Sequence, residues 1–144
     1  MPPFAAYWDA LDADLRHEMG LLTSEEVTQQ RHVRNEMARA IGALLRRENL
    51  LDGGRVDRML NRKAEPADAL HALLEWLARS PADITLINLE DLWLEERPQN
   101  IPGTSQEKPN WRRRMRYTLE DITASKQLSG VLERIHNARR ADNE

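Results

Sequence analysis

One short run of apolar and β-branched residues, ITLI at positions 84–87, constrains the fold more than any other feature of the chain. A continuous run of this kind is typical of a strand covered on both faces, so it predicts a strand at residues 84–87. A lone strand cannot pair its own backbone groups, and the chain shows no clear neighbour for it. We therefore expect a partner chain, or an oligomer of the chain itself, to cover the strand.

Helical patterns account for most of the remaining sequence. Thr23 and Glu26 have the spacing of a capping box, and Pro66 suits a first helical turn. Ser129 and Gly130 weaken the last helical pattern midway. Apolar residues at helical spacing predict helices at about residues 4–19, 23–49, 67–79 and 119–138.

The fold class predicted from these patterns is mostly α, with one or two short strands. Residues 111–117 are ambiguous between a second strand and the start of a helix. The chain has 144 residues and no clear internal boundary, so we expect residues 1–144 to form a single unit.

Several classes of protein are excluded or disfavoured by composition. The chain has no cysteine, which excludes disulfides, thiolate zinc sites and cysteine nucleophiles. No apolar run approaches the ~18 residues of a membrane span, and no signal peptide opens the chain. We therefore expect a cytoplasmic protein without membrane contact. No nucleotide or metal motif is present, and the four histidines lack ligand spacing, so we expect no cofactor and no metal.

Residues 95–110 form a polar, proline-rich loop that is longer than most connections in compact domains. Proline at position 102 and glycine at position 103 predict a turn within it. Hydrogen-bonding side chains and flat apolar faces in and beside the loop suit a polyhydroxylated ligand such as a sugar: Asn100, Thr104, Asn110, Trp93 and Trp111. Core packing is the alternative interpretation of the two tryptophans.

The only basic cluster follows this loop, at Arg112, Arg113, Arg114 and Arg116. Nucleic-acid binding is one interpretation, with phosphate contacts and a stacked Trp. The net charge of −3 argues against a polyanionic partner. Acidic residues between positions 90 and 96 could also pair with the arginines internally. We therefore disfavour nucleic acid as a partner.

Two motifs in this region, NIPGT at 100–104 and NWRRR at 110–114, resemble the C-terminal signature of the 4-alpha-glucanotransferases. These are the amylomaltases or disproportionating enzymes of glycoside hydrolase family 77, in the α-amylase-like clan. INLEDL at 87–92 is similar to the strand-to-helix segment of that family. MPPFAAYW at 1–8 resembles the stretch that follows the family's catalytic His-Asp pair, and LLTSEE at 21–26 also fits, so the resemblance spans nearly the whole chain.

The resemblance implies the C-terminal segment of a (β/α)₈ barrel that transfers α-1,4-glucan units by a retaining mechanism with two carboxyl groups. Barrel active sites lie at the C-terminal ends of the strands, so the loop after residues 84–87 would lie at the glucan cleft. The residues expected to contact an α-1,4-glucan or maltodextrin there are Asn100, Pro102, Gly103 and Thr104. The residues expected to support this rim are Trp111, Arg112 and Arg113.

In one respect the chain departs from the family pattern. The family's nucleophile, acid/base and transition-state-stabilising Asp all lie before the matched segment, and 144 residues fall short of the ~250 of a typical barrel. No catalytic residue is assigned in this chain, and we expect a truncated or split piece that is inactive alone. The alternatives are a small helical interaction or carbohydrate-binding module and, less favoured, a nucleic-acid binder.

Overall fold

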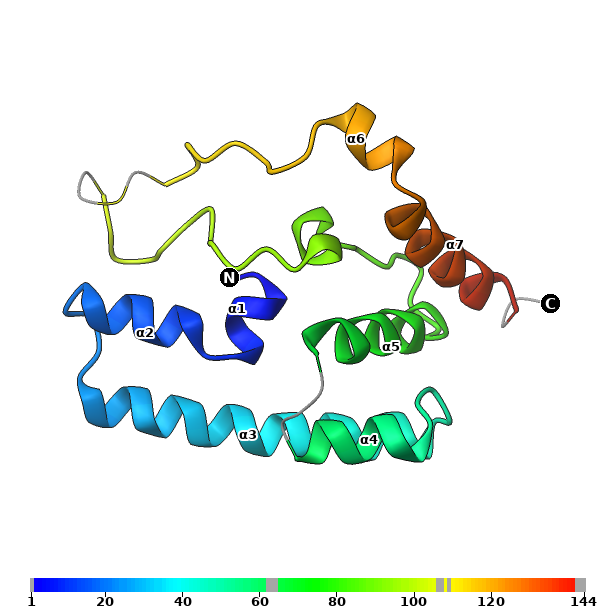
Figure 1. The fold of residues 1–144 in the computed structure, drawn as a ribbon, viewed down its shortest axis with the longest axis horizontal. Coiled ribbons are helices and arrows are strands. Elements are labelled where there is room, and N and C mark those ends of the chain that lie inside the picture. Colours follow the sequence, from blue (N-terminus) through cyan, green and yellow to red (C-terminus); the bar gives the residue numbers. More distant parts are fainter. Residues whose placement is uncertain (1, 62–64, 106–107, 109, 142–144) are drawn as a thin grey trace.

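The computed structural model describes residues 2–61, 65–105, 108 and 110–141. Helices dominate this part of the chain, and Figure 1 shows the long connection after α5 crossing above α1 and α2 before it returns to α6. The helices are α1 (Phe4–Trp8), α2 (Leu11–Glu18), α3 (Ser24–Arg47), α4 (Gly53–Leu60), α5 (Pro66–Ala78), the 3₁₀ helix η1 (Leu89–Trp93), α6 (Leu119–Ala124) and α7 (Lys126–Ala141).

The structure contains no β-strand among its described residues, so the strand predicted at 84–87 and the possible second strand at 111–117 were wrong. Residues 84–87 are extended, but no described segment pairs with their backbone. Ile84 and Leu86 are 76% and 86% exposed. Arg139 of α7 anchors the segment, because its Nη1 donates to Thr85 Oγ1 at 3.3 Å and its Nη2 to the Asp83 carbonyl at 2.8 Å. The residue pattern is that of a strand, but a strand requires a neighbour to exist.

The helix predicted over residues 4–19 is interrupted. Ala10 adopts a left-handed conformation, with a φ of 62°, and separates α1 from α2. Trp8 packs in a cluster with residues of α3, α4 and α5, whereas Ala10 and Ala13 pack with Val27. Because the two segments bury their apolar residues in different clusters, the chain turns between them. Nothing in the local pattern signals this break.

The helix predicted over residues 119–138 is also two helices, but the break lies at Ser125 and not at Ser129 or Gly130. Ser125 has an extended backbone, and its Oγ accepts the N–H of Leu128 at 3.3 Å. Serine favours such capping positions, because its hydroxyl satisfies an N–H that has no partner within the helix. A capping box formed by Thr118 and Asp121 starts α6.

The long helix α3 begins as its sequence predicts. Thr23 Oγ1 accepts the N–H of Glu26 at 3.2 Å, and Glu26 Oε2 accepts the N–H of Thr23 at 2.7 Å. The helix then packs against α4, where Gly42 permits the close approach: a Cβ there would lie 3.3 Å from Leu60 Cδ2. Local capping and one small residue therefore define this helix pair.

The helices bury two main apolar clusters, and α5 contributes to both. One cluster joins α5, η1, α6 and α7, and the other joins α1, α3, α4 and α5. Phe4 packs against both clusters. Because α5 contributes to both clusters and Phe4 of α1 packs against both, these two helices connect the two halves of the core.

A buried ion pair ties the first three helices together. Arg34 of α3 pairs with both carboxylate oxygens of Asp12 in α2, and its Nη1 donates to the Tyr7 carbonyl in α1 at 3.2 Å. The guanidinium also lies 4.1 Å from the centre of the Tyr7 ring.

Among the helices of the described part of the chain, none has the length and apolar character that crossing a bilayer requires.

Candidate functional site

The loop beyond η1 has two limbs, residues 97–101 and residues 110–113, which are joined by hydrogen bonds. The N–H of Trp111 donates to the Gln99 carbonyl at 2.8 Å, and Arg113 Nη2 donates to the Arg97 carbonyl at 2.9 Å. The N–H of Ile101 donates to Asn110 Oδ1 at 2.8 Å. Pairs of residues 97 with 113, 99 with 111 and 101 with 110 therefore bridge the limbs as in a hairpin. Its described residues between 95 and 110 form no helix or strand, and residues 106, 107 and 109 lie outside the described residues.

The turn at the end of the first limb is closed by Thr104 and Asn110. The Thr104 hydroxyl donates to the Ile101 carbonyl at 2.8 Å, and Asn110 Nδ2 donates to the Thr104 carbonyl at 3.1 Å. Gly103 has a φ of 91°, which explains why glycine suits this turn. The polar groups of Thr104 and Asn110 therefore stabilise the loop itself.

Asn100 differs from its neighbours in the NIPGT motif. Its side chain is half-buried and forms no hydrogen bond with any residue that the structure describes. Pro102 and Gly103, next to it, are exposed at the surface. Of the hydrogen-bonding side chains predicted for this rim, Asn100 is the one that has amide groups available to a ligand.

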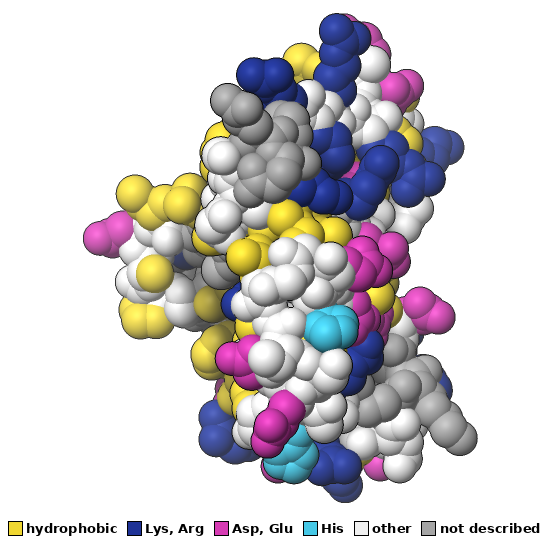
Figure 2. Space-filling view, turned by 90° about the vertical axis from the view of Figure 1, so that its left-hand side faces the viewer, with side chains coloured by type: hydrophobic (Ala, Val, Ile, Leu, Met, Phe, Trp, Pro, Cys, Tyr) yellow, Lys and Arg dark blue, Asp and Glu magenta, His cyan; other side chains and the backbone are white. Residues whose placement is uncertain are grey.

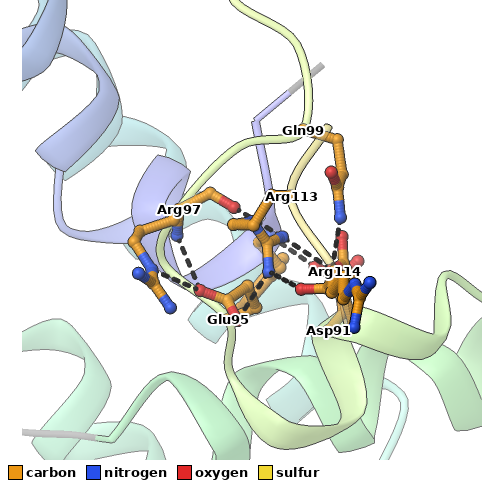
Figure 3. Close-up of polar contacts among 8 residues, drawn as sticks. Asp91, Glu95, Arg97, Gln99, Arg113 and Arg114 are labelled. Carbon is orange, nitrogen blue, oxygen red and sulfur yellow. Dashed lines mark hydrogen bonds and ion pairs between the residues drawn. The ribbon is translucent and has the colours of Figure 1, made fainter. Parts of the chain in front are cut away.

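A cluster of buried charges fixes the loop to η1, as Figure 3 shows. Arg113 Nη2 pairs with Glu90 Oε1 at 2.6 Å, and Arg113 Nη1 pairs with Glu95 Oε2 at 3.2 Å. Gln99 Nε2 also donates to Glu90 Oε1, at 3.0 Å. The side chain of Arg113 is only 18% exposed. The internal pairing expected for the basic cluster therefore exists at Arg113.

Two carboxyl groups of this region have shifted pKa values. Burial acts to raise the pKa of Glu95, but the Arg97 N–H together with the charges of Arg113 and Arg97 holds it below its ordinary value. Burial raises the pKa of Asp91, although that carboxylate accepts the N–H of Phe4 at 2.7 Å. Ionised Glu95 thus stabilises the fold, and this contribution is lost as the pH falls through its lowered pKa.

Two adjoining hollows flank Asn100. The first, of about 230 Å³, separates the loop from α2 and is lined there by Leu15 and Arg16. The second, of about 160 Å³, is lined by Gln99 and Trp111, with Glu90, Asn88 and Pro3. Because Asn100 lines both, the hollows adjoin at this residue. Arg16 was not predicted as a site residue, since nothing in the sequence relates α2 to a loop more than eighty residues away.

A third and larger hollow, of about 430 Å³, lies away from this loop between α5, η1 and α6. It is lined in part by His71, Tyr117 and Asp121. Burial and the nearby charge of Arg134 lower the pKa of His71. Asp121 caps α6, so its carboxylate already has a structural role. Within the described residues, no group of three or more His, Asp or Glu side chains is arranged to hold a metal ion.

The two candidate tryptophans have different environments. Trp93 is 9% exposed and contacts Tyr117 edge-to-face at 5.3 Å, so core packing is the right interpretation for it. Trp111 is 74% exposed and lines the smaller hollow. Core packing is therefore wrong for Trp111.

The remaining arginines form a surface patch. Arg112, Arg114 and Arg116 are exposed, and Figure 2 shows Lys and Arg side chains gathered over the upper part of the molecule. The guanidinium of Arg116 lies 5.5 Å from the centre of the Tyr117 ring. Arg112 and Arg113 are therefore neighbours in sequence with different environments, one facing solvent and the other η1.

Comparison with known proteins decides the family. The sequence profile of a family described as 4-alpha-glucanotransferase matches residues 1–120. The chain belongs to the 4-alpha-glucanotransferase family. The resemblance seen in the NIPGT and NWRRR motifs is thereby confirmed.

Curated members of the 4-alpha-glucanotransferase family match almost the whole chain. The 4-alpha-glucanotransferases of Mycobacterium tuberculosis and Mycobacterium bovis are 33% identical over 146 aligned positions, which cover 96% of this chain and 19% of theirs. That of Haemophilus influenzae is 26% identical over 144 positions, covering 96% of this chain and 20% of its own. The chain thus spans about one fifth of the length of these relatives.

Proposed function

We propose that this chain contributes one rim of the glucan-binding cleft of a cytoplasmic 4-alpha-glucanotransferase, and that the 144 residues alone do not transfer glucosyl units. The proposal depends on Asn100. Its side-chain amide has no described hydrogen-bond partner, and the residue lines two adjoining hollows. The loop that carries it is held by hydrogen bonds between its two limbs and by the ion pairs of Arg113. Hydrogen-bonding groups held in a fixed position suit the hydroxyl groups of a sugar.

In this proposal Asn100 binds the glucan directly. Pro102 and Gly103 give the rim its shape, and Thr104 keeps the turn closed through its bond to the Ile101 carbonyl. Arg113 supports the rim by fixing the loop to η1 through its ion pairs with Glu90 and Glu95. Arg112 is assigned to the same support, although its side chain faces solvent.

The proposed lack of transfer activity is supported by the state of the nearby carboxylates. A retaining mechanism needs two carboxyl groups about 5–5.5 Å apart that are free to act on the sugar. Asp12, beside the first hollow, is paired with Arg34, and Glu90, beside the second, is paired with Arg113. Their charges are neutralised by partners within the chain, as structural carboxylates are.

The test is a calorimetric titration of the purified chain with maltotriose, followed by an assay of the same sample for released glucose. We expect heat of binding at millimolar sugar and no glucose above that of the buffer control. The 4-alpha-glucanotransferase of Mycobacterium tuberculosis serves as the active control. Robust glucose release by the chain would overturn the lack of activity, and the absence of any heat would overturn the glucan rim.

A matched pair of variants locates the binding. Asn100→Ala should weaken the binding of maltotriose. Asn137→Ala, an exposed asparagine on α7, should leave it unchanged. Equal effects of both substitutions would show that the sugar binds elsewhere.

A further inference from the structure

Trp111 combines high exposure with a strained backbone. It is 74% exposed and has a φ of 61°, a left-handed conformation that costs an L-residue other than glycine about 1–2 kcal/mol. Residues held in such conformations cluster at ligand-binding and active sites, where the surrounding structure enforces them. The exposed indole does not contribute to the core, so core packing does not explain the strain.

The contacts on either side of Trp111 keep it in this conformation. Its own N–H is bound to the Gln99 carbonyl at 2.8 Å. Before it, Asn110 is bonded to Ile101 and Thr104, and after it, Arg113 is paired with two carboxylates of the η1 region. The segment that carries the indole is therefore held at residues 110, 111 and 113, through the backbone of Trp111 and the side chains of Asn110 and Arg113.

The hollow beside the indole has the composition of a sugar subsite. Among the residues that line it are Asn88, Gln99 and Asn100, which carry amide side chains, and Trp111, which carries a flat apolar ring. Small-molecule sites combine aromatic surface with a few placed polar groups in this way. The side chain of Gln99 is itself oriented by the bond from its Nε2 to Glu90, so its side-chain oxygen, Oε1, is left to accept from a ligand.

We propose that Trp111 is a stacking surface for one glucosyl residue of an α-1,4-glucan, in a subsite next to Asn100. Gln99 and Asn100 bond the hydroxyl groups of that residue, and the adjoining glucosyl residue occupies the hollow between the loop and Arg16. The inference rests on the proposed function, and it changes the role of Trp111 from supporting the rim to contacting the glucan.

A nucleic-acid base would also stack on an exposed tryptophan, and exposed Arg112 and Arg114 lie nearby. The hollow itself favours a neutral ligand, because the described residues that line it include Glu90 and three residues with amide side chains but no lysine or arginine. Family membership favours a glucan as well. We therefore propose the sugar, and the test below includes the oligonucleotide as an outcome.

The experiment compares maltotriose and maltoheptaose binding by calorimetry in three variants. Trp111→Gly removes the ring and accepts the left-handed φ without strain, so the chain should remain folded by circular dichroism. We expect it to weaken sugar binding about tenfold, the upper end of what an aromatic contact contributes. Trp111→Phe should retain most of the affinity. Leu119→Ala, which truncates another exposed apolar residue 70% accessible to solvent, should have no effect.

The possible results separate the two proposals. If the unaltered chain gives no heat with either sugar, the proposed function fails and the subsite with it. If the chain binds sugar and Asn100→Ala weakens that binding, but Trp111→Gly binds as tightly as the unaltered chain, only the subsite is overturned. Salt-sensitive quenching of tryptophan fluorescence by an oligothymidylate, lost in Trp111→Gly and not competed by maltoheptaose, would assign the ring to nucleic acid instead.

Discussion

Arg113 is the residue on which the position of the loop depends most. It is the common partner of Glu90 and Glu95, whose side chains are only 11% and 6% exposed. Removing one partner of a buried ion pair leaves an uncompensated charge, which costs more than the pair itself contributes. The same guanidinium bonds the Arg97 carbonyl, so the two limbs of the loop would also separate.

Arg113→Ala should therefore lower the free energy of unfolding by about 3 kcal/mol at neutral pH, measured by urea denaturation. The difference in the free energy of unfolding between Arg113→Ala and the unaltered chain should become smaller as the pH is lowered. Glu95, whose pKa is lowered in the folded chain, becomes protonated as the pH falls through that value and no longer needs its cation. Arg114→Ala, at an exposed arginine next to Arg113, is the control and should cost less than about 0.5 kcal/mol. Equal losses in the two variants, or a difference that does not change with pH, would contradict this role.

At the scale of the elements, glycine is favourable in the turn of the loop and unfavourable inside α7. Gly103 has a φ of 91° in the turn of the loop. Among the described residues other than its chain neighbours, the atom nearest to an added Cβ would be Leu21 Cδ2, at 3.9 Å. Gly130 lies inside α7, and outside its own helix backbone and chain neighbours a Cβ there would meet no atom of the described residues within 4 Å. The first glycine is required by its backbone, and the second only lowers the stability of its helix.

The same substitution should thus have opposite effects at the two positions. Gly103→Ala should lower the free energy of unfolding by about 1 kcal/mol because of the left-handed φ. Gly130→Ala should raise it by about 0.5–1 kcal/mol, since alanine favours the helix over glycine. Thermal unfolding of both variants measures the two shifts. A gain in stability from Gly103→Ala would show that the turn does not hold this conformation in solution.

At the scale of the whole molecule, residues 84–87 are an extended segment with an uncovered face. Ile84 and Leu86 expose their side chains, and Arg139 of α7 bonds Thr85 within the segment and the carbonyls of Ala82 and Asp83 just before it. Extended apolar segments with unpaired backbone groups favour pairing with another chain. We therefore expect a partner chain or a second copy of this chain to cover the segment in the functional assembly.

The purified chain should accordingly associate as its concentration rises, as measured by sedimentation velocity. Leu86→Lys should shift the equilibrium towards the monomer, because a charge on this face opposes strand pairing. Val33→Lys, which places the same charge at another exposed apolar residue on α3, should not. A chain that stays monomeric at every concentration, with and without Leu86→Lys, would argue against self-association through this segment.

Local interactions could be read from the sequence, and long-range ones could not. The capping box of Thr23 and Glu26 involves residues only three positions apart, so the local sequence is sufficient to predict the start of α3. The motifs at 100–104 and 110–114 likewise identified the family. The break at Ala10 was missed, because it follows from packing Trp8 and Ala13 into separate clusters.

The candidate site shows the same division. Its polar and aromatic residues were visible in the sequence, but their roles depend on which partners the folded loop supplies. Asn110 and Thr104 bond each other, whereas Asn100 has no described partner and Trp111 faces solvent. The sequence by itself determined the helical character of the chain, the start of α3, the turn of the loop and the family. Only the tertiary structure decided where the first and last predicted helices break, which side chains are free to meet a ligand, and that residues 84–87 form no strand. The reason is that hydrogen bonds and packing between distant segments depend on the fold and not on neighbouring residues.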